Sequence, residues 1–333
     1  MKFGSHFIVR SATEEDEWAI DINVTEWVKI QEWEFPWSEF SSKKISKEKP
    51  GTEILVNRLR PEVAAKFGTE NFTTTIIKSI KSKHRQFVAN GLSINVNGQH
   101  VEATSLYFLQ KDNLLKPGVD NLTFKDEDEA DVKARIVVAV GDSSPREAGW
   151  YVIGNGRVIL EADTRTETGW GAKGDGGSLL LPNYHNQYAR FRGIVSFESK
   201  DSSRIPWNTT KDDIDEESPI WQSTFRRMTE MARPVMAFLN DLDADIDEHG
   251  HQHSALLGLV SKSEKKTVET YTRKASFSAP TKEYASKHPK TIKIQYYRPT
   301  VDVEFLKEEL GASSASELGG MTFDYILKRK KAS

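Results

Sequence analysis

Cysteine is absent from this chain of 333 residues. Its absence excludes a disulfide framework, a thiol nucleophile and any zinc or iron–sulfur site held by cysteine. Long apolar runs are lacking too, since none approaches the ~18 residues that a membrane span needs. The first residues do not form the apolar segment of a secretory signal. We therefore predict a cytoplasmic globular protein with no membrane association.

A large excess of charge is also lacking, because 46 basic residues stand against 49 acidic ones, for a net charge of −3. This near-neutral total argues against attraction of nucleic acid by the whole molecule, although local patches can still attract it. At roughly 150 residues per domain, the length indicates about two domains with ample apolar material for a core.

Hydrophobic patterning indicates an α+β fold. Alternating apolar and polar positions predict antiparallel strands, and apolar positions three and four apart predict amphipathic helices. The expected strands are 6–11, 18–27, 52–59, 134–141, 149–160 and 191–199, with a hairpin turn at Asn97-Gly98 and short strands at 267–273 and 291–297. The expected helices are 62–89, 219–239 with a kink at Pro234, 302–310 and 315–331.

Three motifs suggest ligand sites but fit them poorly. The histidines of residues 249–253 follow an acidic segment without a cysteine partner, so we predict a surface loop there and not a metal site. The acidic run 241–250 lacks the glycine and glutamate that a calcium loop requires at its sixth and twelfth positions. The glycine-rich stretch 168–177 does not open a helix and has no Walker ending, so we expect a mobile loop.

One segment is more informative. Residues 204–219, RIPWNTTKDDIDEESP, lie directly after an expected strand and directly before an expected long helix. A Pro-Trp pair braces the loop, so Lys211 can be presented as a point charge to a phosphate group. The alternative is that Lys211 is one more loop lysine among 46 basic residues.

The order of these motifs resembles that of the GHKL ATPase superfamily, and within it MORC-like members and related bacterial ATP-binding proteins. Ile153–Ile159 is similar to a strand motif of MORC proteins, and Pro206–Asp213 resembles their lysine-containing loop. The resemblance covers about residues 1–245. It implies a Bergerat-type α/β sandwich, mostly antiparallel sheet with helix, followed by a transducer-type β/α domain.

Site residues follow from this resemblance. Gly51 and Thr52 resemble the late Gly-Thr box beneath the adenine pocket, and Lys211 resembles the switch lysine that reaches the γ-phosphate. The resemblance implies ATP and magnesium as ligands. A cation aimed at phosphoryl oxygens stabilises developing charge and senses which nucleotide is bound.

The chain also departs from the family. No E-x-x-x-N helix, D-x-G-x-G box or lid precedes Gly51, and Glu53 and Asn57 fit the first spacing only on an expected strand. The start resembles the sequence just after the lid, so we expect a truncated protein that starts inside the nucleotide domain. ATP hydrolysis by this chain alone is not expected. The expected domains are residues 1–89 (nucleotide domain), 90–250 (transducer) and 251–333 (basic extension).

The favoured function is coupling of nucleotide state to dimer closure and to action on DNA or a partner protein, with phage defence as one setting known among relatives. A homodimer or a complementing upstream chain is the expected partner. The alternative is a non-enzymatic module that binds nucleic acid or protein. It rests on residues 262–298, where ten Lys and Arg stand against three Glu. Aromatic residues lie between these charges, as in single-strand binders: Tyr271, Phe277, Tyr284, Tyr296 and Tyr297.

Overall fold

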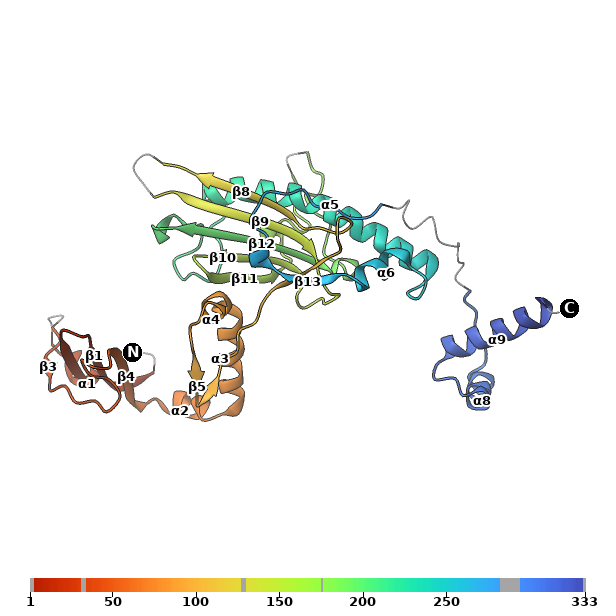
Figure 1. The fold of residues 1–333 in the computed structure, drawn as a ribbon. Coiled ribbons are helices and arrows are strands. Elements are labelled where there is room, and N and C mark those ends of the chain that lie inside the picture. The colour runs from red at the N-terminus through yellow and green to blue at the C-terminus, as the bar shows by residue number, and fades with distance from the viewer. Residues whose placement is uncertain (1–2, 31–33, 127–129, 175, 282–293, 332–333) are drawn as a thin grey trace.

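The computed structural model confirms an α+β fold built from antiparallel sheets and helices (Figure 1). It describes residues 3–30, 34–126, 130–174, 176–281 and 294–331. A small N-terminal sheet and a large central sheet lie at separate places along the chain, with helices between them. No helix in these described ranges is long and apolar enough to cross a membrane.

The N-terminal sheet has four strands in the order β3-β2-β1-β4. Its elements are β1 (Gly4–Ala12), β2 (Glu17–Asn23), the single-turn helix α1 (Val24–Trp27), β3 (Trp37–Ser38) and β4 (Gly51–Leu59). The predicted β1–β2 hairpin is confirmed, and Thr13 closes its turn by accepting a hydrogen bond from the Asp16 amide at 3.0 Å. The strand predicted over 18–27 is wrong in its last four residues, because Asn23 caps the helical turn Val24–Trp27. The predicted strand 52–59 is confirmed as β4, which pairs antiparallel with β1.

Residues 62–89 are largely helical, as predicted, but they do not form one continuous helix. Three helices occupy this range: α2 (Pro61–Phe67), α3 (Glu70–Lys83) and α4 (Arg85–Ala89). Gly68 ends α2, and the Thr69 hydroxyl caps α3 by accepting from the Phe72 amide at 3.3 Å. The hairpin that follows, β5 (Asn95–Val96) and β6 (Gln99–His100), confirms the predicted turn. Asn97 and Gly98 take φ values of 50° and 80°, which an Asn-Gly pair adopts readily.

The central sheet has five strands in the order β11-β10-β12-β9-β8. These are β8 (Gly118–Phe124), β9 (Val132–Val140), β10 (Gly149–Gly154), β11 (Arg157–Asp163) and β12 (Phe191–Ser199). β10 and β12 run parallel, and the other neighbours are antiparallel. The single strand predicted at 149–160 is in fact the β10–β11 hairpin. Asn155 and Gly156 form its turn at φ 44° and 81°, an Asn-Gly signal that the prediction overlooked.

Both faces of the central sheet are covered. The long helix α5 (Pro219–His249) and α6 (Ala255–Ser261) pack on one face, against side chains such as Ile136, Val138 and Trp150. The other face carries Val137, Ala139 and Ile194, which pack with Phe108 of a second ribbon. That ribbon pairs β7 (Tyr107–Gln110) with β13 (Glu264–Thr267). This two-sided burial explains the nearly continuous apolar run of β9.

The predicted helix 219–239 is confirmed but extends ten residues further, to His249, and it continues through Pro234. Trp170, in the glycine-rich stretch expected to be a mobile loop, is buried in the core at 2% exposure. Short 3-10 helices lie in the connections between these elements: η1 (Thr166–Thr168), η2 (Asn186–Tyr188), η3 (Ser202–Arg204) and η4 (Val268–Thr270).

The C-terminal helices are confirmed as α8 (Thr300–Leu310) and α9 (Ala315–Lys331). The strand predicted at 267–273 is wrong beyond Thr267. The chain turns there into η4, which buries Val268 and lets the Tyr271 hydroxyl donate to the Gln110 side chain at 2.6 Å. Of the strand predicted at 291–297, the first three residues lie outside the described ranges and the other four form no strand.

Candidate functional site

The loop that carries Lys211 connects β12 to α5 and is anchored at both sides. Ile205 is buried, and the ring of Trp207 covers Gly154 of β10, where an added Cβ would lie 2.7 Å from the ring. Trp207 also forms a β-bridge with Ile214 across the loop. The Pro-Trp segment therefore braces the loop against the central sheet.

Asn208 organises the turn itself. Its side-chain oxygen accepts from the Asp212 amide at 3.1 Å, and its side-chain nitrogen donates to the Asp212 carboxylate at 2.8 Å. The backbone amide of Lys211 donates to the Asn208 carbonyl at 3.0 Å. Asparagine forms such turns readily because its side chain bonds to backbone groups a few residues ahead.

Lys211 occupies an unusual backbone conformation at the tip of this turn. Its φ is 56°, in the left-handed region that non-glycine residues seldom adopt. Its ammonium lies 4.5 Å from the centroid of the Trp207 ring. The described residues give Lys211 no carboxylate ion pair, so its cation is held over an aromatic face and remains half-buried.

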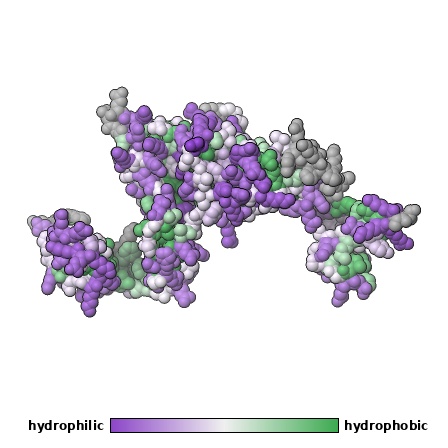
Figure 2. All heavy atoms as spheres, viewed as in Figure 1, coloured by the Kyte–Doolittle hydropathy of each residue, from purple (hydrophilic) through white to green (hydrophobic). Residues whose placement is uncertain are grey.

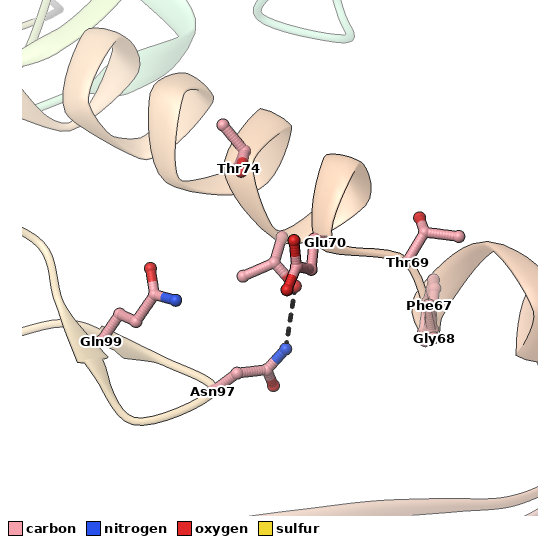
Figure 3. A pocket seen from close by; sticks show the side chains of 8 residues that line it. Phe67, Gly68, Thr69, Glu70, Thr74, Asn97 and Gln99 are labelled. Carbon is pink, nitrogen blue, oxygen red and sulfur yellow. Dashed lines mark hydrogen bonds between the residues drawn. The ribbon is translucent and has the colours of Figure 1, made fainter.

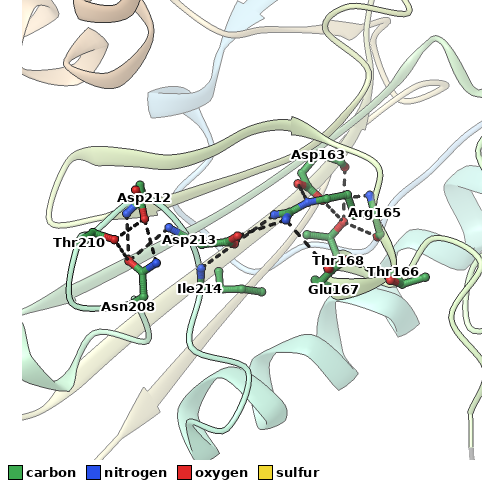
Figure 4. A network of polar contacts seen from close by, with 10 residues as sticks. All are labelled: Asp163, Arg165, Thr166, Glu167, Thr168, Asn208, Thr210, Asp212, Asp213 and Ile214. Atoms are coloured by element: carbon green, nitrogen blue, oxygen red, sulfur yellow. Dashed lines mark hydrogen bonds and ion pairs between the residues drawn. The ribbon is translucent and has the colours of Figure 1, made fainter.

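A second network ties the loop to β11 (Figure 4). Arg165 donates both terminal nitrogens to the Asp213 carboxylate, at 3.1 and 3.2 Å, and its Nε to Asp163 at 2.6 Å. Asp163 is nearly buried and also accepts from the Thr168 hydroxyl at 2.8 Å. The loop is thus connected to the strand end by a bidentate ion pair.

The electrostatics of the loop keep both of its adjacent aspartates ionised. The Arg165 guanidinium holds the pKa of Asp213 below its usual value. Hydrogen bonds from Thr210 and then Asn208 lower the pKa of Asp212, and the charge of Lys83 acts in the same direction. Since Lys83 is the last residue of α3, the end of that helix lies near the loop.

Helices α3 and α4 also contact the β10–β11 hairpin. Glu161 of β11 accepts from both Ser82 and Arg85, and an added Cβ on Gly156 would lie 3.1 Å from the Phe87 ring. The helices, the hairpin and the Lys211 loop therefore form one connected assembly at this end of the central sheet.

Gly51 and Thr52 lie elsewhere. They begin β4, an edge strand of the N-terminal sheet, and the Thr52 hydroxyl bonds to Ser11 at 3.1 Å. The structure therefore places Gly51 and Thr52 in the N-terminal sheet and Lys211 in the loop that follows the central strand β12, and it does not bring them together. Glu53 is engaged by Arg10 at 2.7 Å and Asn57 lies near His6, which agrees with their expected position on a strand.

A cavity of about 410 Å³ lies between the α2–α3 junction and the β5–β6 hairpin (Figure 3). Asn97 spans it by donating to Thr73 at 3.0 Å, and Glu70 and Gln99 also line it. Its lining mixes polar side chains with Phe67, and it contains neither Lys211 nor Gly51.

The described residues do not assemble a complete site for ATP and magnesium. Within the described ranges, no group of three His, Cys, Asp or Glu side chains is placed to hold a metal ion. His249 instead ends α5 and pairs with Asp245 at 3.0 Å. Of the residues predicted to contact ATP, Lys211 lies in the loop between β12 and α5, and Gly51 and Thr52 lie at the start of β4.

The sequence alone did not indicate Arg165 as part of the site. It lies 48 residues from Asp213, and nothing in the local pattern of either segment predicts their contact. The N-T-T-K-D-D run did carry a local signal for the turn, because Asn, Thr and Asp form side-chain-to-backbone bonds over this spacing.

No protein-family model and no curated protein sequence matches this chain. One solved structure that is similar to it is the B subunit of DNA gyrase from Myxococcus xanthus. The two share 12% identity, and the match covers 71% of this chain and 76% of that one with a TM-score of 0.34. A similarity this distant carries no functional argument.

Proposed function

We propose that this chain is the transducer part of a GHKL-type ATPase, in which Lys211 senses the γ-phosphate of ATP. One observation carries the proposal: an anchored loop presents a lysine in a strained backbone conformation with no carboxylate partner among the described residues. Such strain costs on the order of 1–3 kcal/mol and persists where the surrounding structure enforces it, which is common at functional sites.

The energies favour transfer of the Lys211 ammonium from Trp207 to a phosphate. The cation–π contact at 4.5 Å is worth about 0.5–2 kcal/mol, depending on how far it is desolvated. A hydrogen bond between charged groups contributes about 1.5–3 kcal/mol. Trp207 therefore holds the side chain extended without binding it too tightly for release.

The anchoring of the loop gives a route from the phosphate to the transducer. Asp213 connects the loop to Arg165 of the β11 end, and five residues later Ser218 caps α5. Loss of the γ-phosphate removes the contact of Lys211 and relaxes the loop, as in other nucleotide switches. Motion of α5 then carries the signal to a dimer partner, to DNA or to another protein.

The remainder of the nucleotide site belongs, in this proposal, to another polypeptide segment, with Gly51 and Thr52 beneath the adenine. The support is a face of the N-terminal sheet that is covered around Ile22, which is 2% exposed, but open toward β4. Paired residues of antiparallel strands share a face, and Val9 pairs with both Ile20 and Ile54. Ile54 is 65% exposed, and Val56 on the same face is 38% exposed. An apolar sheet face of this kind requires a covering layer.

The test is calorimetric titration with the magnesium complex of a β,γ-imido analogue of ATP. The chain is titrated alone and together with the polypeptide encoded immediately upstream. We expect the analogue to bind, and Lys211→Ala to weaken it about tenfold, the loss of one charge-assisted bond. Lys200→Ala, an exposed lysine at the end of β12, is the matched control and leaves binding unchanged.

ADP provides the second control, because it has no γ-phosphate and its affinity should be the same for the parent and for Lys211→Ala. Absence of binding in both titrations would overturn the nucleotide function. Binding that is indifferent to Lys211→Ala would overturn the sensor role and leave the lysine as an ordinary loop residue.

For the alternative nucleic-acid module, the described part of residues 262–298 gives mixed support, since Tyr296 and Tyr297 are 54% and 91% exposed but other members of the segment are engaged within the chain. Lys265 pairs with Asp142 at 2.7 Å, and Lys274 pairs with Asp120 at 2.9 Å. Phe277 packs against the core, and Tyr284 lies outside the described residues. Nucleic-acid binding stays a prediction, and a steep loss of affinity with added salt is its signature.

A further inference from the structure

The C-terminal helical hairpin, residues 300–331, exposes far more large apolar side chains than it buries. Within it, only Ala312 and Leu318 are buried hydrophobic residues. Figure 2 shows hydrophobic side chains gathered on this part of the molecule. The exposed large hydrophobic residues, at 38–80% exposure, are Val301, Phe305, Leu306, Leu310, Met321, Phe323, Tyr325, Ile326 and Leu327.

The sequence nevertheless encodes the hairpin clearly. Gly311 ends α8 at φ 67°, and the Ala312 amide donates back to the Lys307 carbonyl at 3.0 Å. Ser314 accepts from the Glu317 amide at 3.1 Å, and Glu317 accepts in return from the Ser313 amide at 2.8 Å. A unit of this size has too little core to be stable alone, so its helices need a covering surface.

The two helices carry opposite charges. Acidic residues outnumber basic ones four to one in α8, whereas the last turn of α9 reads Lys328-Arg329-Lys330-Lys331. The C-terminal end of α9 points away from α8 (Figure 1). Between these charged ends, Phe323, Tyr325 and Ile326 are more than half exposed on different sides of α9. A helix that is apolar on most sides belongs inside a larger assembly.

We propose that the α8–α9 hairpin is a homodimerisation module, covered by the same hairpin of a second copy of this chain. In a two-fold arrangement each basic α9 end lies against the acidic α8 of its partner, so one surface is complementary to itself. Burial of a Phe or Tyr side chain removes about 150–250 Å² from water. The exposed parts of three such side chains per copy therefore supply roughly half of the ~1,200 Å² that a stable interface needs.

This proposal is independent of nucleotide binding. It is tested on the full chain by sedimentation velocity over a range of protein concentrations. We expect a species of twice the chain mass of 37.7 kDa. Phe323→Glu places a charge in the interface and should give a monomer, with an unchanged circular dichroism spectrum. Leu114→Glu, at a side chain that is 40% exposed far from the hairpin in sequence, is the matched control and should remain a dimer.

Exchanging the charges of the two helices distinguishes pairing with a second copy of the chain from binding to any other partner. Glu308→Lys with Glu309→Lys, and separately Lys328→Glu with Lys331→Glu, should each weaken dimerisation about tenfold or more by placing like charges together. All four substitutions in one chain should restore it, because both copies then carry the exchanged pattern. A monomer at every concentration, or a dimer indifferent to Phe323→Glu, would overturn the proposal. Binding of the monomer to anionic vesicles would reassign the hairpin to membranes.

Discussion

Removal of the Arg165 side chain tests how the Lys211 loop is anchored. Arg165 joins Asp163 at 2.6 Å to Asp213 at 3.1 Å, and these bonds, to Asp213 first and then to Asp163, raise its own pKa. Arg165→Ala breaks both contacts at once, whereas Asp213→Asn weakens only the contact to the loop. Comparing the two variants separates the stability of the fold from the positioning of the loop.

The contacts of Arg165 with Asp163 and with Asp213 differ in burial, so their contributions to the free energy of unfolding should differ. The Asp163 side chain is 8% exposed, and loss of Arg165, its charged partner among the described residues, leaves it with the Thr168 hydroxyl and a backbone amide. Removing one member of a buried pair costs about 3–5 kcal/mol. Arg165 is itself 44% exposed, so water can replace part of its contact with Asp163. We therefore expect Arg165→Ala to lower the free energy of unfolding by about 2 kcal/mol. Asp213 is 41% exposed, so Asp213→Asn should cost less than about 1 kcal/mol.

Urea denaturation, followed by the fluorescence of the eight tryptophans, measures both losses. The affinity for the ATP analogue should fall in both variants, since each releases the loop that holds Lys211. Equal stability losses in the two variants would refute the argument from burial. An unchanged affinity in Asp213→Asn would refute the anchoring role of Arg165.

The pH dependence has a definite sign. Arg165 lowers the folded pKa of Asp213, so the stabilisation by this carboxylate is complete above its unfolded value of 3.8 and is lost as the pH falls through the folded pKa. The difference in stability between the parent and Asp213→Asn should therefore shrink in acid and should not change between neutral and mildly alkaline pH.

Two further predictions concern the central sheet. Asp120 bonds to Arg227 at 2.6 Å and Lys274 at 2.9 Å; burial raises its pKa, but these partners outweigh burial and lower it. In urea denaturation at neutral pH, Asp120→Asn should lower the free energy of unfolding by about 1–3 kcal/mol. This loss should shrink below the unfolded pKa of 3.8, and a loss that stays constant with pH would contradict the argument. Gly193→Ala would place a Cβ 2.4 Å from the buried Trp150 ring and should cost about 1–3 kcal/mol or more by thermal denaturation, whereas a neutral result would show that the ring can move.

Local signals were enough to predict most elements of this fold. The alternation in the first hairpin, the apolar run of β9 and the Asn97-Gly98 turn all appear in the structure as expected. Two of the errors arose where two local signals competed. Asn155-Gly156 interrupts a β-rich run that reads as one strand, and Gly68 breaks an otherwise helical pattern. In each case the local breaker residue decided the structure.

Trp170 shows what local signals could not supply. It lies among glycines that indicate a mobile loop, yet it stacks edge-to-face on Phe191 and packs with Tyr188 inside the core. This burial depends on contacts with distant segments, which no window around residue 170 contains. The same holds for Arg165 and Asp213, which meet across 48 residues.

The positions of Gly51 and Lys211 constrain how the proposed sensor can work. Each is held by its own sheet, Gly51 through pairing with β1 and Lys211 through Trp207 and Asn208. A lysine side chain cannot span two separate modules, so a nucleotide above β4 meets Lys211 only if the modules move together. The contacts of α3 and α4 with the β10–β11 hairpin place the joint between them beside the Lys211 loop. Closure about this joint, rather than a preformed pocket, is the arrangement that the sensor function requires.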